Sequence, residues 1–98
     1  MSVGLAIKKA MERAREHERL STRRLRVRVT TYHGDYEDGL TIRAVIAVKT
    51  GAELSAQMDA GVRHIEWEEL DARCDELVGL VDEVVAEVEQ AIGLQAKD

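Results

Sequence analysis

Arginine recurs at every second position near the middle of the chain and offers the clearest candidate chemistry. Arg24, Arg26 and Arg28 alternate with apolar residues, and Arg43 and Lys49 hold matching positions in the next apolar run. Each guanidinium presents a planar fork of donors that suits a carboxylate or a phosphate. A surface that gathers these groups is suited to an acidic partner.

Three interpretations of this arginine cluster stand open. It is a solvated or covered sheet face, with the acidic helix of a second copy as a candidate cover. It binds an acidic protein. Or it binds nucleic acid, with Tyr32 stacking on a base. Aromatic residues interleaved with basic ones are nearly absent, and the net charge is −5, so nucleic acid is the least favoured partner.

A second charged set lies in the C-terminal third, on the outer face of a predicted helix. Its nine carboxylates belong to Glu68, Glu69, Asp71, Asp75, Glu76, Asp82, Glu83, Glu87 and Glu89. Such a face is commonly solvated, and the sharper alternative is recognition by a basic partner, including mimicry of a nucleic-acid backbone. We expect the partner contacts at Asp75, Asp82, Glu83 and Glu87.

Metal binding and catalysis find little support in the residue pattern. His33, Asp35, Glu37 and Asp38 share one turn, but their spacing matches no EF-hand, zinc finger or zincin. Cys74 lies beside acidic residues that disfavour a thiolate. The chain carries neither a Gly-rich phosphate loop nor a nucleophile elbow. We therefore predict no enzyme activity, no metal and no cofactor.

Charge is divided unevenly along the chain. Residues 1–50 carry 11 Lys and Arg against 6 Asp and Glu, whereas residues 51–98 carry 3 against 13. This asymmetry indicates a basic and an acidic surface on one small protein, able to meet unlike partners or copies of itself. The core must consist of small aliphatic side chains, because there is no Phe, one Trp and two Tyr. Cys74, the only cysteine, is expected to be buried.

The N-terminal half predicts a helix followed by a hairpin. Residues 3–20 have apolar positions at spacings of three and four, with Ser2 as N-cap. Residues 24–32 and 40–49 alternate as strands, joined by a turn rich in Gly and Asp. In the first strand Leu25, Val27 and Val29 share one face, and the arginines share the other.

The C-terminal half predicts helices. Thr50 to Glu53 match a capping box, so residues 52–60 predict a short helix that ends at Gly61. Residues 62–67 are ambiguous between a third strand and an irregular lead-in. Residues 67–92 predict one long helix, with an interior Gly79 where another backbone approaches and Gly93 as C-cap.

These elements give an α+β fold of order α-β-β-(α)-α, in one domain over residues 1–98. A two-stranded sheet is marginal in water, and its edges invite pairing. We therefore predict a homo-oligomer, with a dimer favoured, in which two hairpins meet edge to edge.

No apolar run suits a signal peptide or a membrane span, so we expect a cytoplasmic protein without a membrane partner. The expected function is a non-enzymatic protein-binding module, a small adaptor or inhibitor that uses the arginine face and the acidic helix. The Arg-rich, Ala- and Val-rich composition is compatible with a phage-encoded accessory or virion-assembly protein, found in the host cytoplasm or the virion. The alternative is a nucleic-acid-binding protein that uses the same arginine face.

Overall fold

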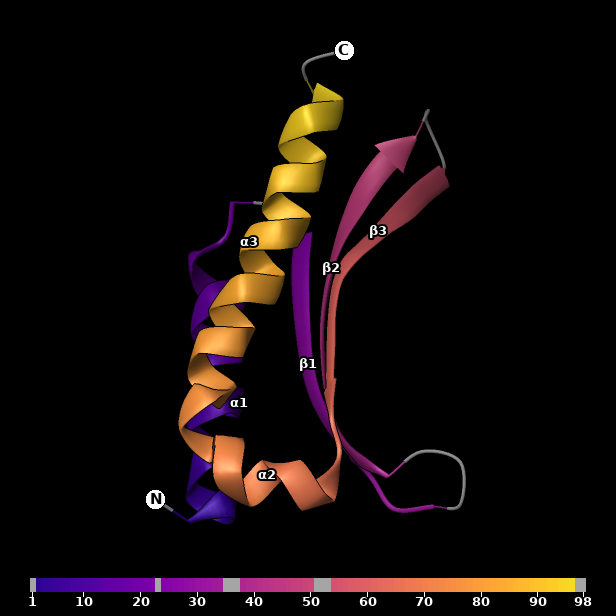
Figure 1. Cartoon of the computed structure of the whole chain (residues 1–98). Coiled ribbons are helices and arrows are strands. Elements are labelled where there is room, and N and C mark those ends of the chain that lie inside the picture. Colours follow the sequence, from indigo (N-terminus) through magenta and orange to yellow (C-terminus); the bar gives the residue numbers. More distant parts are fainter. Residues whose placement is uncertain (1, 23, 35–37, 51–53, 97–98) are drawn as a thin grey trace.

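Two helices cover one face of a three-stranded antiparallel sheet in the computed structural model of the chain (Figure 1). Residues 2–22, 24–34, 38–50 and 54–96 are described, with the backbone alone described at 48–50, 54–60 and 92–96. The elements are α1 (Val3–Leu20), β1 (Arg24–Tyr32), β2 (Gly39–Thr50), β3 (Leu54–Ile65), α2 (Trp67–Arg73), the 3-10 turn η1 (Cys74–Glu76) and α3 (Leu77–Ala96). The predicted α+β class is confirmed.

Helix α1 has the bounds that its sequence pattern predicts. The Ser2 hydroxyl accepts a hydrogen bond from the Leu5 backbone N–H at 3.2 Å and so caps the first turn. Ala6, Ala10 and Ala14 recur every four residues and are buried. These small side chains let α1 approach both β1 and α3.

The predicted hairpin of β1 and β2 is confirmed. The strands pair antiparallel from Arg24 opposite Ala47 to Tyr32 opposite Gly39. Gly39 has a φ of 138°, a conformation that a side chain would strain. Leu25 and Val27 point toward the helices and are buried, so the alternate arginines point away from them.

The predicted short helix over residues 52–60 is wrong, because residues 54–65 form β3 on the other side of β2. The ambiguity over residues 62–67 is resolved the same way, since the strand runs to Ile65 and α2 begins at Trp67. A register shift between Ala44 and Ile46 bends this pairing. Gly61 is no helix cap. It lies in β3, where an added Cβ would stand 2.3 Å from the Val84 carbonyl oxygen of α3.

The single long helix predicted over residues 67–92 is also wrong. Arg73 leaves helical geometry, with φ −117° and ψ 11°, and η1 follows before α3 begins. Figure 1 shows α2 turned across the end of the sheet while α3 runs along it. The expected roles of two glycines are wrong as well. Among the described residues no other element lies within 4 Å of a Cβ added at Gly79, and α3 continues past Gly93 to Ala96.

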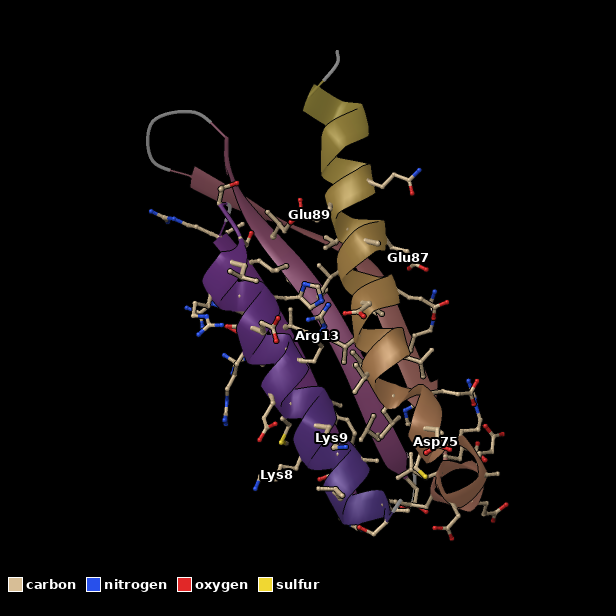
Figure 2. All side chains as sticks on the ribbon, turned by 90° about the vertical axis from the view of Figure 1, so that its left-hand side faces the viewer. Lys8, Lys9, Arg13, Asp75, Glu87 and Glu89 are labelled. Carbon is tan, nitrogen blue, oxygen red and sulfur yellow. The ribbon has the colours of Figure 1, made fainter. Side chains whose placement is uncertain are left out.

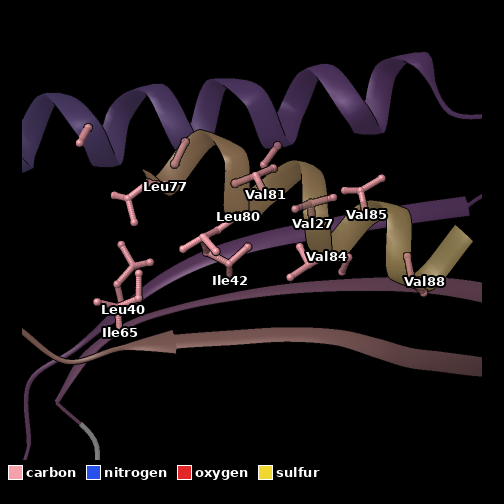
Figure 3. Close-up of a cluster of buried hydrophobic side chains, with 14 of the residues drawn as sticks. Val27, Leu40, Ile42, Ile65, Leu77, Leu80, Val81, Val84, Val85 and Val88 are labelled. Atoms are coloured by element: carbon pink, nitrogen blue, oxygen red, sulfur yellow. The ribbon is translucent and has the colours of Figure 1, made fainter. Parts of the chain in front are cut away.

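The core lies between α3 and the inner face of the sheet (Figure 3). Leu77, Val81, Val84 and Val88 of α3 are fully buried, and so are the sheet residues Leu40, Ile42 and Ile65. Cys74 is buried at the edge of this cluster, as predicted. The aliphatic core is therefore confirmed, and it occupies one side of the sheet. None of the helices in the described part of the chain is both long and apolar enough to cross a membrane.

The third strand removes the reason on which the oligomer was predicted. The prediction assumed a sheet of two strands, which is marginal alone. Since β3 completes a three-stranded sheet within one chain, pairing with a second copy is not needed for that purpose. The oligomer stays a prediction, and its support now comes from the charged surfaces described below.

Candidate functional site

Four arginines project from the face of the sheet that α1 and α3 leave open. We call this set, Arg24, Arg26, Arg28 and Arg43, the basic face. Side chains alternate between the two faces of a strand, so the burial of Leu25 and Val27 directs their arginine neighbours outward. All four arginines are exposed. The structure thus brings together the arginines that the sequence singled out.

The sheet register places these charges close to one another. Arg28 lies directly opposite Arg43, and Arg26 lies opposite Val45. Positions i and i+2 of one strand are about 7 Å apart, so Arg24, Arg26 and Arg28 form a row. Like charges that oppose each other across a sheet destabilise it. Arg28 and Arg43 therefore bring two positive charges close together in the basic face.

Three arginines elsewhere in the molecule are paired with carboxylates of the same chain, while Arg15 and Arg19 of α1 are exposed and form no ion pair that the structure describes. Arg13 lies 2.8 Å from both Asp82 and Glu16, and Arg73 lies 2.9 Å from Glu76. Arg63 pairs with Glu87, and this hydrogen bond lowers the pKa of the Glu87 carboxyl.

The row of arginines on β1 differs from the three paired arginines Arg13, Arg63 and Arg73. In the part of the chain that the structure describes, Arg24, Arg26 and Arg28 form no ion pair. Their donors therefore remain available to a partner.

One hollow lies on the open face, and a second reaches around the edge of the sheet at β1, where Glu18 of α1 and Leu25 help to line it. The first is lined by Arg28, Thr30, Tyr32, Thr41, Arg43, Val62, His64 and Glu66. The other is lined by Glu18, Arg24, Leu25, Arg26, Arg28, Val45 and Ala47. Val62 is 39% exposed, so the face offers apolar as well as charged contact. That mixture is typical of protein-binding surfaces.

Tyr32, predicted to stack on a base, is half-buried at the end of β1. Its carbonyl oxygen accepts a hydrogen bond from Trp67 Nε1 at 2.9 Å, which fixes the start of α2 against the sheet. His33 stacks on the Trp67 ring at a centroid distance of 4.9 Å. Aromatic rings thus cluster at one end of the sheet, and base stacking by Tyr32 stays a prediction.

The predicted acidic contacts do not form one surface. Asp82 faces α1, where it lies 2.8 Å from Arg13 Nε and 2.6 Å from His17 Nε2 (Figure 2). Burial raises the pKa of the Asp82 carboxyl, but the hydrogen bonds with His17 and Arg13 outweigh it and hold the pKa below its ordinary value. Asp82 therefore joins the two helices.

Of the remaining predicted acidic contacts, one is paired within the chain and two are exposed. Glu87 is engaged by Arg63 of β3, so it links α3 to the edge of the sheet. Asp75 and Glu83 are exposed. Asp75 has exposed acidic neighbours on α2, and we call Glu68, Asp71 and Asp75 the acidic surface.

Other candidate positions add no chemistry. Lys49 lies in β2 opposite Ser55, and its side chain falls outside the described residues, as do residues 35–37 of the suspected metal turn. No group of three or more His, Cys, Asp or Glu residues suited to a metal occurs among the described residues. The Cys74 thiol is buried and lies 3.6 Å from the Asp71 carbonyl oxygen.

Sequence reasoning missed the contribution of β3 to the open face. His64 and Val62 lie beside Thr41 and Arg43 of β2, and Thr41 Oγ1 is 2.8 Å from His64 Nδ1. The alternation of outward Val62 and His64 with inward Arg63 and Ile65 was the available signal.

Comparison of the chain with family models, curated proteins and solved structures finds no match.

Proposed function

We propose that this protein is a non-enzymatic binding module that uses its basic face to bind an acidic surface of a partner protein. The observation that carries the proposal is the gathering of four exposed arginines on one face of the sheet. Arg13, Arg63 and Arg73 are satisfied by carboxylates of the same chain, whereas the row on β1 is exposed and pairs with none that the structure describes. A small adaptor or inhibitor would act through such a surface.

The chemistry of the face favours carboxylates over a nucleic-acid backbone. Val45, Val62 and Thr41 lie among the arginines and give the surface an apolar and hydroxyl component that suits a folded protein. A net charge of −5 opposes general attraction to a polyanion such as DNA. Nucleic-acid binding is the alternative that the experiment must separate from this proposal.

The test is binding of a fluorescent oligoglutamate peptide, followed by fluorescence anisotropy at low and moderate salt. R26E/R28E reverses the middle of the basic face, and the matched control K8E/K9E reverses as many charges on α1, where both lysines are exposed (Figure 2). We expect R26E/R28E to lose about tenfold or more in affinity, as expected for charges central to a contact, and K8E/K9E to lose little.

Binding of labelled single-stranded DNA and of labelled duplex DNA is measured in the same assay as binding of the peptide. Equal loss of peptide binding in both variants would contradict the role of the basic face. DNA binding that is tighter than peptide binding and depends on Arg26 and Arg28 would replace the proposal with the nucleic-acid alternative. Substituting R26K/R28K tests the guanidinium fork itself, because lysine keeps the charge but not the paired donors.

A further inference from the structure

The acidic surface lacks a basic counterpart in its own neighbourhood. Glu68, Asp71 and Asp75 are exposed on α2 and η1. Between Glu66 and Ala96 the only basic residue is Arg73, and Glu69 and Glu76 already pair with it. The acidic surface is thus left with an uncompensated negative charge.

The basic face complements this surface in charge, and the two do not meet within one chain. Figure 1 shows α2 across the lower end of the molecule. The basic face belongs to the opposite side of the sheet from the helices, as the burial pattern of β1 shows. No ion pair of the described residues joins Arg24, Arg26 or Arg28 to any carboxylate. A contact between the two surfaces therefore requires two molecules.

We propose that the acidic surface of one copy docks onto the basic face of the next copy. This rests on the proposed function, since it names a second copy of this chain as the acidic partner. Val62 and Val45 lie among the arginines and would be covered from solvent, while the charged pairs surround them.

The contact joins unlike surfaces, and we take it to be head to tail, since a two-fold dimer would have to make the same contact twice about one axis. Repetition of a head-to-tail contact builds a ring or an open chain of molecules. Pairing of two strand edges about a two-fold axis would instead stop at a dimer. The two modes of assembly therefore differ in the mass that they produce.

Two complementary variants test this contact. R26E/R28E disables the basic face and keeps the acidic surface, and D71N/D75N neutralises the acidic surface and keeps the basic face. Light scattering with size-exclusion chromatography measures the mass of each at about 50 mM and about 500 mM salt, where the screening length falls from about 14 Å to about 4 Å. We expect wild type to assemble beyond a dimer at low salt and to dissociate at high salt, and each variant alone to be monomeric.

Mixing the two variants gives the decisive measurement. Each retains the surface that the other lacks, so an equimolar mixture should form a one-to-one complex that cannot grow further. Formation of this complex also shows that both variants are folded. K8E/K9E serves as the control and should assemble as wild type does.

Three results would overturn the docking of a second copy: a monomeric wild type at low salt and high concentration, assembly of both variants equal to wild type, or no complex in the mixture. These outcomes are distinct from failure of the proposed function. A monomeric wild type that still binds oligoglutamate through Arg26 and Arg28 keeps the binding module and rejects the second copy as its partner.

Discussion

Alanine substitution at two glycines is expected to change stability in opposite directions. Gly61 lies in β3 beneath α3, and a Cβ at this position would stand 2.3 Å from the carbonyl oxygen of Val84 and 2.9 Å from its Cα. Gly79 lies within α3, and a Cβ there would meet no other element within 4 Å. The same chemical change therefore introduces a clash at one position and a free methyl group at the other.

The size of each effect follows from these distances. Carbon and oxygen ordinarily approach no closer than about 3.3 Å, so the backbones of β3 and α3 must separate by about 1 Å in Gly61→Ala. Overpacking costs about 1–3 kcal/mol, and we expect the upper end because the opposing atoms are backbone. At about 4–8 °C per kcal/mol, the Tm falls by roughly 12–24 °C. Gly79→Ala removes a helix-interior glycine and gains about 1 kcal/mol, or roughly 4–8 °C.

Both variants are measured by thermal unfolding followed by circular dichroism and by urea unfolding followed by Trp67 fluorescence. An unchanged or higher Tm in Gly61→Ala would refute the close approach of α3 to β3. A lower Tm in Gly79→Ala would show that this position of α3 is closed to a side chain. The sign of the difference between the two variants thus tests the packing of α3 on the sheet.

Three further substitutions test other contacts. Arg28→Thr removes a charge opposite Arg43 and introduces a good strand former, so the free energy of unfolding should rise by about 0.5 kcal/mol while oligoglutamate binding weakens; a loss of stability would mean that Arg28 is paired within the chain. Asp82→Asn should lower the Tm at neutral pH. Because the folded pKa of Asp82 is depressed, this difference should disappear as the pH falls below the ordinary value of 3.8, and a difference that persists in acid would exclude the ion pairs as its cause. Trp67→Phe loses the hydrogen bond to the Tyr32 carbonyl and should cost about 1 kcal/mol in urea unfolding followed by circular dichroism; an unchanged midpoint would show that this bond does not hold α2.

The elements that the sequence predicts correctly are those with local determinants. Helix α1 has a serine cap and an amphipathic spacing, and the structure begins and ends it at the predicted residues Val3 and Leu20. β1 also has its predicted bounds, because arginine and aliphatic residues alternate from Arg24 to Val29 and the strand formers Thr and Tyr complete it. In both cases a few neighbouring residues carry all of the information.

β3 was not predicted because its strand structure depends on β2 rather than on its own composition. Residues 54–60 include Leu, Ala, Gln and Met, which are helix formers. Pairing with β2 overrides that preference, and the shift in register near Ala44 disturbs the alternation that would have revealed a strand. The break at Arg73 was hidden for a related reason: Leu70, Cys74 and Leu77 keep helical spacing through it, and all three are buried.

For the candidate site, the sequence identified the charges but not their partners. Alternation alone placed Arg24, Arg26 and Arg28 on one face, as the structure has them. Which carboxylates are already engaged depends on contacts between distant segments, such as Asp82 with Arg13 of α1. Asp82 therefore proved to join two helices, whereas Asp75, equally acidic in sequence, is exposed.

The placement of the arginines agrees with the proposed binding role, and solubility does not account for it. A protein with a net charge of −5 gains no solubility from a row of adjacent positive charges, and acidic residues serve that purpose better. The fold gains no ion pair from Arg24, Arg26 or Arg28 among the described residues. Local features that oppose stability are expected where function requires them. Arg28→Thr tests whether the basic face serves binding. A gain in stability together with a loss of binding is the result expected of a binding surface, and a neutral surface would not give it.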